Sequence, residues 1–209
     1  MTIKINSGHY RGMSLKLPQG LTTRPTISRV REAVLNSLGA SLAHAAVLDL
    51  FAGSGAWGIE ALSRGAKSAA FVERDQEAIK CLRAYLNETA RRAASQGLPA
   101  PITQLHTSDL RICLESVVAS GPYTIVWADP PYDEAETWAE ELVATAAALL
   151  EAGGLFLLES RADSGPKILG CIESSRVLEL IKQRRYGDTT ITTASRVVSE
   201  RGSHERAEP

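Results

Sequence analysis

The chain has 209 residues, of which 44% are hydrophobic and 22% are charged, and its formal net charge is -1. A chain of this size and composition can bury a full core, so we expect one main soluble domain with a small appendage. The three cysteines are widely spaced and odd in number, which excludes a C-x-x-C metal pair and an even disulfide set. The N-terminus lacks the apolar core of a signal peptide, and no run approaches about 18 apolar residues, which predicts a cytoplasmic protein without membrane contact.

The charge is distributed unevenly along the chain. Residues 1–31 contain no Asp or Glu, whereas their basic residues are Lys4, Arg11, Lys16, Arg24, Arg29 and Arg31. This asymmetry indicates a basic surface that can bind the phosphates of a nucleic acid. A solvated basic face without a partner is the alternative.

The same basic segment predicts two short strands and a helix. Residues 3–5 and 13–17 read as strands around a turn-prone stretch at 6–8, so we expect a hairpin. A helix over 28–38 follows. Its apolar positions, which we expect to face the core, are Val30, Val34, Leu35 and Leu38, whereas Arg29 and Arg31 point outward.

A buried strand over 47–51 runs directly into a glycine-rich loop and a helix. Gly53, Gly55 and Gly58 match the G-x-G-x-x-G spacing of a nucleotide-binding turn. Glu73, at the end of the next strand, is positioned for ribose hydroxyls, which also fits a dinucleotide. Asp49 distinguishes between the two ligands, because a carboxylate that points into the loop repels the pyrophosphate of a dinucleotide and attracts the cationic groups of S-adenosylmethionine. The sequence therefore favours the methyl donor over NAD, with a turn-bonding role for Asp49 as the alternative.

A strand-loop-helix order repeats along the chain. The expected strands cover residues 45–50, 68–73, 102–106, 123–128 and 154–159, with helical stretches between them. This alternation predicts a parallel sheet with helices on both faces, in which ligands bind outside the carboxyl ends of the strands. The candidates that follow strand ends are Asp49 with its loop, Glu73, residues 108–109 and residues 129–132. We expect them to share one cleft.

The tetrapeptide Asp129-Pro130-Pro131-Tyr132 is the candidate catalytic motif. Two successive prolines stiffen the backbone as it leaves the strand. The Asp129 carboxylate and the Pro130 carbonyl then become two fixed hydrogen-bond acceptors, and Tyr132 becomes an aromatic plate beside them. A planar amino group on a ring needs such an arrangement. A strand-ending turn is the alternative.

A second basic cluster ends a late strand and consists of Lys182, Arg184, Arg185 and Tyr186. It either borders the same cleft and contacts a nucleic acid, or protects an edge strand from pairing. The sequence leaves both interpretations open.

Several ordered motifs together resemble the RsmD family of 16S ribosomal RNA guanine-N2 methyltransferases. They lie at residues 8–12, 24–26, 29–32, 48–55, 60–66, 71–73 and 129–132, and the resemblance covers about residues 3–198. It implies a Rossmann-like class I methyltransferase fold, with a seven-stranded, mostly parallel sheet, helices on both faces and an N-terminal β-hairpin extension. It also implies, as substrate, guanine 966 of 16S rRNA in the assembling small subunit. Residues 1–40 would form an RNA-binding extension, 41–199 the methyltransferase domain and 200–209 a disordered tail.

The resemblance also implies roles for individual residues. The expected S-adenosylmethionine-binding residues are Asp49, Phe51, Gly53, Gly55, Glu73, Arg74 and Asp109. The expected catalytic residues are Asp129, Pro130, Pro131 and Tyr132, which orient the guanine amine and stack on the base. The expected RNA-binding residues are His9, Arg11, Arg24, Arg29, Arg31, Arg184 and Arg185. No metal is required, and we expect a monomer.

The chain departs from the usual family pattern at a few positions, which are His9, Ser28, Leu35 and Trp57. Three other activities remain open. An adenine-N6 DNA methyltransferase shares the Asp-Pro-Pro-Tyr motif, a glutamine-N5 protein methyltransferase uses a related Asn-Pro-Pro-Tyr, and a non-catalytic assembly factor could bind RNA. The first usually carries a target-recognition domain, for which no segment here is long enough.

Overall fold

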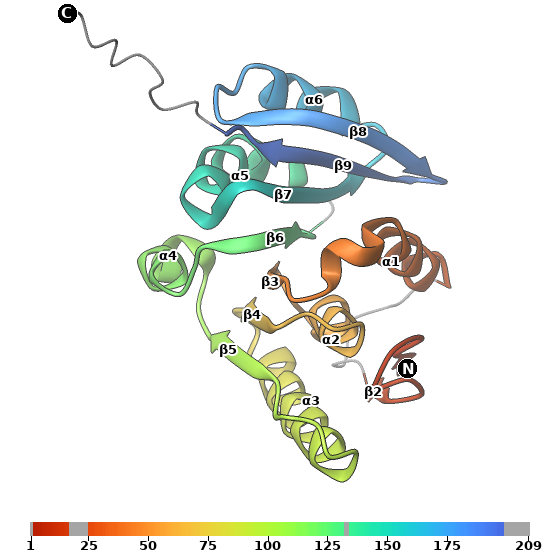
Figure 1. Cartoon of the computed structure of the whole chain (residues 1–209). Helices are drawn as coiled ribbons and strands as arrows, with labels where there is room; N and C mark the ends of the chain where they lie inside the picture. The colour runs from red at the N-terminus through yellow and green to blue at the C-terminus, as the bar shows by residue number, and fades with distance from the viewer. Residues whose placement is uncertain (1, 17–24, 132–133, 199–209) are drawn as a thin grey trace, which may run out of the picture.

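A computed structural model describes residues 2–16, 25–131 and 134–198 (Figure 1). In these ranges, seven strands form one sheet in the order β5-β4-β3-β6-β7-β9-β8. The strands are β3 (Ala46–Leu50), β4 (Ser68–Val72), β5 (Ile102–His106), β6 (Tyr123–Ala128), β7 (Leu150–Arg161), β8 (Leu178–Tyr186) and β9 (Thr189–Arg196). The five strands expected from the sequence are all present, although β7 is longer at both ends.

The direction of the chain reverses twice across this sheet. Strands β5, β4, β3, β6 and β7 pair in parallel, whereas β9 is antiparallel to both β7 and β8. The strand order turns back between β3 and β6, because the chain first builds outward through β4 and β5 and then crosses to β6. Such a switch point leaves a crevice outside the carboxyl ends of the two central strands.

Helices cover both faces of the sheet, as Figure 1 shows. They are α1 (Pro25–Leu38), α2 (Ala56–Ser63), α3 (Gln76–Ser95), α4 (Leu110–Ala119), α5 (Ala135–Leu149) and α6 (Gly165–Glu173), with a short 3-10 helix at Gly39–Leu42. Buried side chains of α1, α2 and α3 pack on one face, and those of α4, α5 and α6 pack on the other. Parallel strands buried on both faces need this cover, which explains their continuous apolar sequences.

The expected N-terminal hairpin is present as β1 (Thr2–Lys4) paired antiparallel with β2 (Ser14–Lys16). Its buried side chains, which join the core cluster of α1 and α2, are Ile3, Ile5, Tyr10, Met13 and Leu15. The hairpin and α1 therefore share one core with the sheet, and residue 40 does not separate two cores. The expected tail at 200–209 lies outside the described residues.

The hairpin loop docks against the end of α2. Gly8 has φ of 79°, and a Cβ at this position would lie 1.7 Å from the Ser63 carbonyl oxygen. The amides of His9 and Tyr10 donate to the Ser63 carbonyl and to Ser63 Oγ, each at 2.8 Å. Only glycine fits here, because both the conformation and the space exclude a side chain.

The expected outward orientation of Arg31 is wrong. Its side chain is only 5% exposed, and its Nε atom lies 3.0 Å from Oε2 of Glu60, which is fully buried on α2. Arg31 Nη2 also donates to the Lys4 carbonyl at 2.9 Å. A charged group in a core needs such a partner, so Glu60 turns Arg31 inward and the residue is not available to bind RNA. Arg31 therefore joins α1 to α2 and to the hairpin.

No helix within the described ranges is both long enough and apolar enough to cross a membrane.

Candidate active site

The loop after β3 is held open by backbone conformations that few residues adopt. Phe51 has φ of 62°, although it is not a glycine, and Gly53 and Gly55 have φ of 53° and 72°. A Cβ on Gly55 would lie 2.3 Å from Leu82 Cδ1, whereas a Cβ on Gly53 would meet nothing within 4 Å. The left-handed conformation of Gly55 favours glycine, and a Cβ there would also displace the Leu82 side chain, whereas the space beside Gly53 is free. A non-glycine residue in this conformation is typical of functional sites.

The Asp49 carboxylate accepts a hydrogen bond from the first turn of α2. Its Oδ2 atom accepts a hydrogen bond of 2.9 Å from the Gly58 amide, and the residue is only 2% exposed. Burial raises the pKa of Asp49 well above its ordinary value, and the neighbouring carboxylates of Asp129 and Glu73 raise it further, while the Gly58 hydrogen bond lowers it. The structure therefore contains the turn bond that the alternative for Asp49 predicts. Asp49 also lies at the end of β3, just before the glycine loop.

Glu73 lies across the loop from Asp49. Glu73 Oε2 accepts from the Gly53 amide at 2.6 Å, and Oε1 accepts from the amides of Arg74 and Asp75 at 2.7 and 2.8 Å. These bonds join the end of β4 to the glycine loop of β3. The carboxylate is thus held at the edge where a ribose is expected.

Asp109 and Arg74 connect the next two strand ends. Asp109 begins α4 by accepting from the Arg111 amide, and its Oδ2 atom lies 2.9 Å from Arg74 Nη1. Although desolvation acts in the opposite direction, the Arg111 hydrogen bond and the Arg74 guanidinium lower the pKa of Asp109. Asp109 is therefore a carboxylate at neutral pH and closes the cleft on the β5 side.

Asp129 follows β6 on the other side of the switch point. Its amide donates to the Leu50 carbonyl at 3.4 Å, which ties the tetrapeptide to the end of β3. Desolvation raises the pKa of Asp129 to about 7. Pro130 is buried and Pro131 is exposed, and the Pro131 carbonyl accepts from the Glu134 amide at 2.8 Å. Tyr132 lies outside the described residues.

Sequence reasoning missed Glu159, which lies beside Asp129. Ala128 of β6 pairs with Leu158 of β7, so the residues that follow them are neighbours on adjacent strands. Glu159 is only 5% exposed, and both desolvation and the Asp129 carboxylate raise its pKa well above its ordinary value. Glu159 and Asp129 therefore form a pair of buried acidic groups whose titrations influence each other. A single acidic residue inside an expected strand gives no sign of this proximity, and only the pairing of β6 with β7 reveals it.

Two aromatic pairs lie on opposite faces of the sheet near the loop after β3, and neither contact was predicted from the sequence. Phe51 packs edge-on against Trp138 with ring centroids 5.1 Å apart, and the Arg111 guanidinium lies 3.8 Å above the Trp138 ring. Trp57, where the family usually has a small aliphatic residue, stacks on Trp127 at 5.3 Å. Both Trp57 and Trp127 are buried, so the departure at 57 fills the core behind the loop.

The RNA-binding candidates do not all lie near this edge. Residues 65 and 67 hydrogen-bond to residues 44 and 45 at the start of β3, so the nearby Ser63 lies at the amino edge of the sheet. His9 and Arg11, whose loop docks on Ser63, are exposed there and are not brought together with Asp129. Arg29 is exposed on α1, and Arg24 lies outside the described residues.

Two basic candidates of β8 lie on opposite faces of the sheet. Arg184 lines a groove beside α1. Arg185, its neighbour in the strand, points to the other face, and its Nε atom donates to the Gly187 carbonyl at 2.7 Å. The two arginines therefore cannot bind the same strand of RNA along one face.

The strand order, with its switch point between β3 and β6, defines a class I methyltransferase fold. A model of the family described as "Conserved hypothetical protein 95" matches residues 3–195, and the chain belongs to this family, the RsmD family. The chain is 32% identical over 178 residues to "Putative rRNA methyltransferase YlbH" of Bacillus subtilis, covering 83% of this chain and 91% of that protein.

Other relatives agree with this assignment. "Ribosomal RNA small subunit methyltransferase D" of Escherichia coli is 36% identical over 135 residues, which cover 62% of this chain and 60% of that protein. The structure of "Putative methyltransferase yhhF" from Escherichia coli has a TM-score of 0.70 at 27% identity and covers 95% of this chain and 99% of that chain. A putative methyltransferase solved in complex with SAH has the same fold, with a TM-score of 0.65 at 18% identity, covering 87% of this chain and 53% of that chain.

Proposed function

We propose that this chain transfers a methyl group from S-adenosylmethionine to the exocyclic N2 amine of a guanine in 16S rRNA, during assembly of the small subunit in the cytoplasm. The observation that carries this proposal is the hydrogen bond from the Asp129 amide to the Leu50 carbonyl. It ties the tetrapeptide to the end of β3, where the glycine loop begins. Family membership and the names of the relatives support rRNA as the substrate. We expect the chain to act as a monomer.

The acidic lining suits the methyl donor. Asp129 and Glu73 are close enough to Asp49 for their charges to raise its pKa. A cluster of this sign attracts the ammonium and sulfonium groups of S-adenosylmethionine and repels a pyrophosphate. Asp49 would hold the amino-acid end, Glu73 the ribose hydroxyls and Asp109 the adenine amino group, with Phe51 and the loop backbone against the rings. Arg74 would act through Asp109, to which it is bonded.

Donor binding gives the first test. Replacing Glu73 with Ala should weaken S-adenosylmethionine binding about tenfold or more, because charge-assisted hydrogen bonds to two ribose hydroxyls are lost. Isothermal titration measures the change. Glu77→Ala is the matched control, since Glu77 is exposed in the first turn of α3 and should leave affinity unchanged. Equal affinity of the native chain for NAD would contradict the donor assignment.

The chemistry needs Asp129 as a carboxylate. Its oxygens and the Pro130 carbonyl accept the two N-H bonds of the amine, which directs the nitrogen lone pair at the methyl carbon in line with the sulfonium. The C-S bond breaks as the N-C bond forms, and the products are SAH and a methylated, positively charged nitrogen that readily loses its proton. Positioning supplies most of the acceleration, because the sulfonium is already a reactive methyl source. Tyr132 would stack on the extruded base.

The pKa of Asp129, about 7, predicts a pH dependence. Below this pH the carboxyl is neutral and accepts poorly, so kcat/KM should fall about tenfold per pH unit below 7 and level off above it. Steady-state rates of methyl transfer from labelled donor between pH 5.5 and 8.5 measure this profile.

Glu159 supplies the control for this profile. Glu159→Gln keeps the shape of the side chain and removes its titration, so an inflection near pH 7 that remains in this variant belongs to Asp129. A profile of the native chain without any inflection near pH 7 would show that Asp129 ionisation does not limit the reaction.

The product identifies the substrate. Mass spectrometry of nucleosides from 16S rRNA of a deletion strain should show loss of N2-methylguanosine, and the purified chain should restore it. Loss of a methylated adenine, or of a methylated glutamine in a protein, would instead support one of the alternative activities. An unchanged pattern would favour the non-catalytic assembly factor.

A further inference from the structure

Strand β8 contains a bulge that changes the face on which its basic side chains lie. Its pairing with β9 passes from Leu180–Ala194 directly to Lys182–Thr193, so Ile181 is an extra residue. Leu180 packs with the core under α5 and α6. Strict alternation would place Lys182 on that same apolar face, but the extra residue reverses the alternation beyond it.

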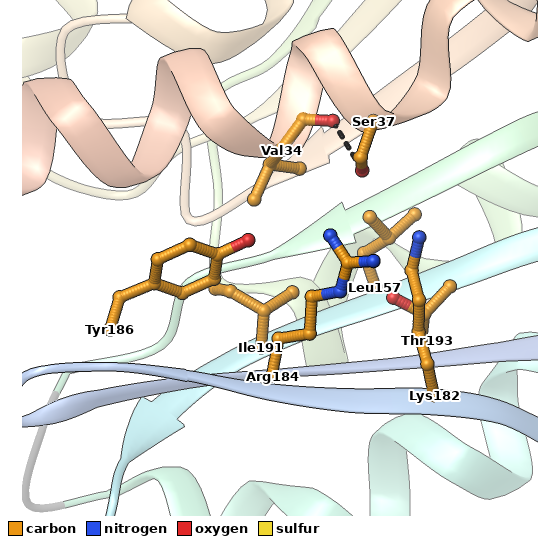
Figure 2. A pocket seen from close by; sticks show the side chains of 8 residues that line it. All are labelled: Val34, Ser37, Leu157, Lys182, Arg184, Tyr186, Ile191 and Thr193. Carbon is orange, nitrogen blue, oxygen red and sulfur yellow. Dashed lines mark hydrogen bonds between the residues drawn. The ribbon is translucent and has the colours of Figure 1, made fainter.

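Beyond the bulge, alternate side chains of β8 face helix α1. They line a groove between α1 and the sheet, which Figure 2 shows with its side chains. The lining residues are Val34 and Ser37 of α1, Leu157, Ile191 and Thr193 of β7 and β9, and Lys182, Arg184 and Tyr186 of β8. Gln183 lies on the other face, where its amide donates to the Gly165 carbonyl at 3.2 Å. The bulge thus gathers the cations of β8 beside α1.

The groove is cationic. None of its lining residues is acidic, and Lys182 and Arg184 have no ion-pair partner among the residues that the structure describes. Its volume is about 220 Å³, including the part open to solvent. Two unpaired cations that face the same side of β8 suit the phosphates of a polyanion.

The groove reaches the level of the catalytic motif. Arg184 pairs with Ile191, and Ile191 pairs with Glu159, the neighbour of Asp129. Arg184 is therefore level with Asp129 along the strands and three strands away, a separation of about 14 Å. Tyr186 lies two residues further toward the carboxyl edge of the sheet. Leu157 lines the groove, and its strand partner Trp127 belongs to the same core cluster as the buried residues of α1 and α2. The groove therefore lies on the face of the sheet that α2 covers.

We propose that this groove binds the ribose-phosphate backbone of the RNA strand next to the target guanine. Lys182 and Arg184 ion-pair with phosphates, and the Tyr186 hydroxyl donates to a phosphate oxygen. The inference rests on the proposed function and adds the place where the RNA leaves the methyl-transfer site. It also separates Arg184 from Arg185, which the bulge directs to the opposite face.

A salt titration tests the groove. The variant Lys182→Ala/Arg184→Ala should bind an unmodified 16S rRNA transcript about tenfold or more weakly at about 0.15 M salt. Its plot of log affinity against log salt should be less steep by about 1.4, since each phosphate contact to a single strand contributes about 0.7. SAH binding should be unchanged. The matched control is Lys80→Ala/Arg83→Ala, which removes the same charge from exposed positions on α3 at the other end of the sheet.

The outcomes separate the groove from the proposed function. If the native chain methylates small-subunit RNA but the two double variants have the slope of the native chain, the groove proposal alone is overturned. If the β8 variant binds the transcript normally but loses affinity for small-subunit particles, the groove binds a protein and the proposal is again overturned. If the native chain neither binds nor methylates RNA, both proposals fail.

Discussion

Asp129→Ala should lower turnover by on the order of a hundredfold or more while leaving the affinity for S-adenosylmethionine nearly intact. The substitution removes an acceptor that orients the reacting amine, and lost positioning of a reacting group lowers kcat rather than binding of the other substrate. The glycine loop keeps its own contacts, because Glu73 accepts from the Gly53 amide and Asp49 accepts from the Gly58 amide of α2, and neither bond involves Asp129. Single-turnover methyl transfer, together with isothermal titration of the donor, measures both quantities.

The matched control for this variant is Asp163→Ala. Asp163 is an exposed carboxylate beyond β7 whose salt bridge to Arg161 is also exposed, so its loss should change neither rate nor affinity. If Asp129→Ala retains native turnover, the tetrapeptide is only a strand-ending turn. If donor affinity falls in parallel with turnover, the damage extends to the loop after β3 and the assigned role is too narrow.

Arg31→Ala should reduce the free energy of unfolding by about 3 kcal/mol, the lower end of the range for breaking a buried ion pair. The lower end is expected because Glu60 keeps a second partner, Arg64, whose Nη2 atom lies 2.9 Å from Glu60 Oε1. The hydrogen bond to the Lys4 carbonyl is lost as well. Urea denaturation measures the change.

Arg29→Ala provides the comparison two residues away on the same helix. Arg29 is exposed, so its replacement should change stability by no more than about 0.5 kcal/mol. A fully stable Arg31→Ala variant that binds RNA weakly would restore the role expected from the sequence.

The residue pattern predicts the five parallel strands, because the central strands β3, β4 and β6 are buried on both faces. The seven-stranded sheet follows only from the family resemblance. Continuous apolar runs such as residues 123–128 cannot be surface segments, and their alternation with helices leaves few topologies. The convergence of Asp49, Glu73 and Asp109 at one edge follows directly from parallel pairing. The Arg74–Asp109 and Glu73–Gly53 contacts agree with that expectation. The RNA contacts and individual catalytic roles remain predictions.

The rest depended on pairings between distant segments. The predicted orientation of Arg31 is wrong because helical periodicity does not show which residues of other helices lie beside α1. The partner of Arg31, Glu60, is 29 residues away in the sequence. The proximity of Glu159 to Asp129 follows only from the pairing of β7 with β6. The bulge at Ile181 reverses the alternation of β8, and no composition signal marks it. In each case the pairing of two elements decided the outcome, and the sequence of either element alone does not reveal it.

Helix α2 has no face in contact with solvent. Every residue from Ala56 to Ser63 is buried, because the sheet lies on one side and α1 with the hairpin lies on the other. Such a helix cannot tilt or unwind locally without opening the surrounding core, so its amides should exchange hydrogen only through large-scale unfolding. The glycine loop at its N-terminus is then already ordered before the donor arrives. If this loop binds the donor as proposed, little conformational entropy is lost on binding, because the loop does not have to become ordered.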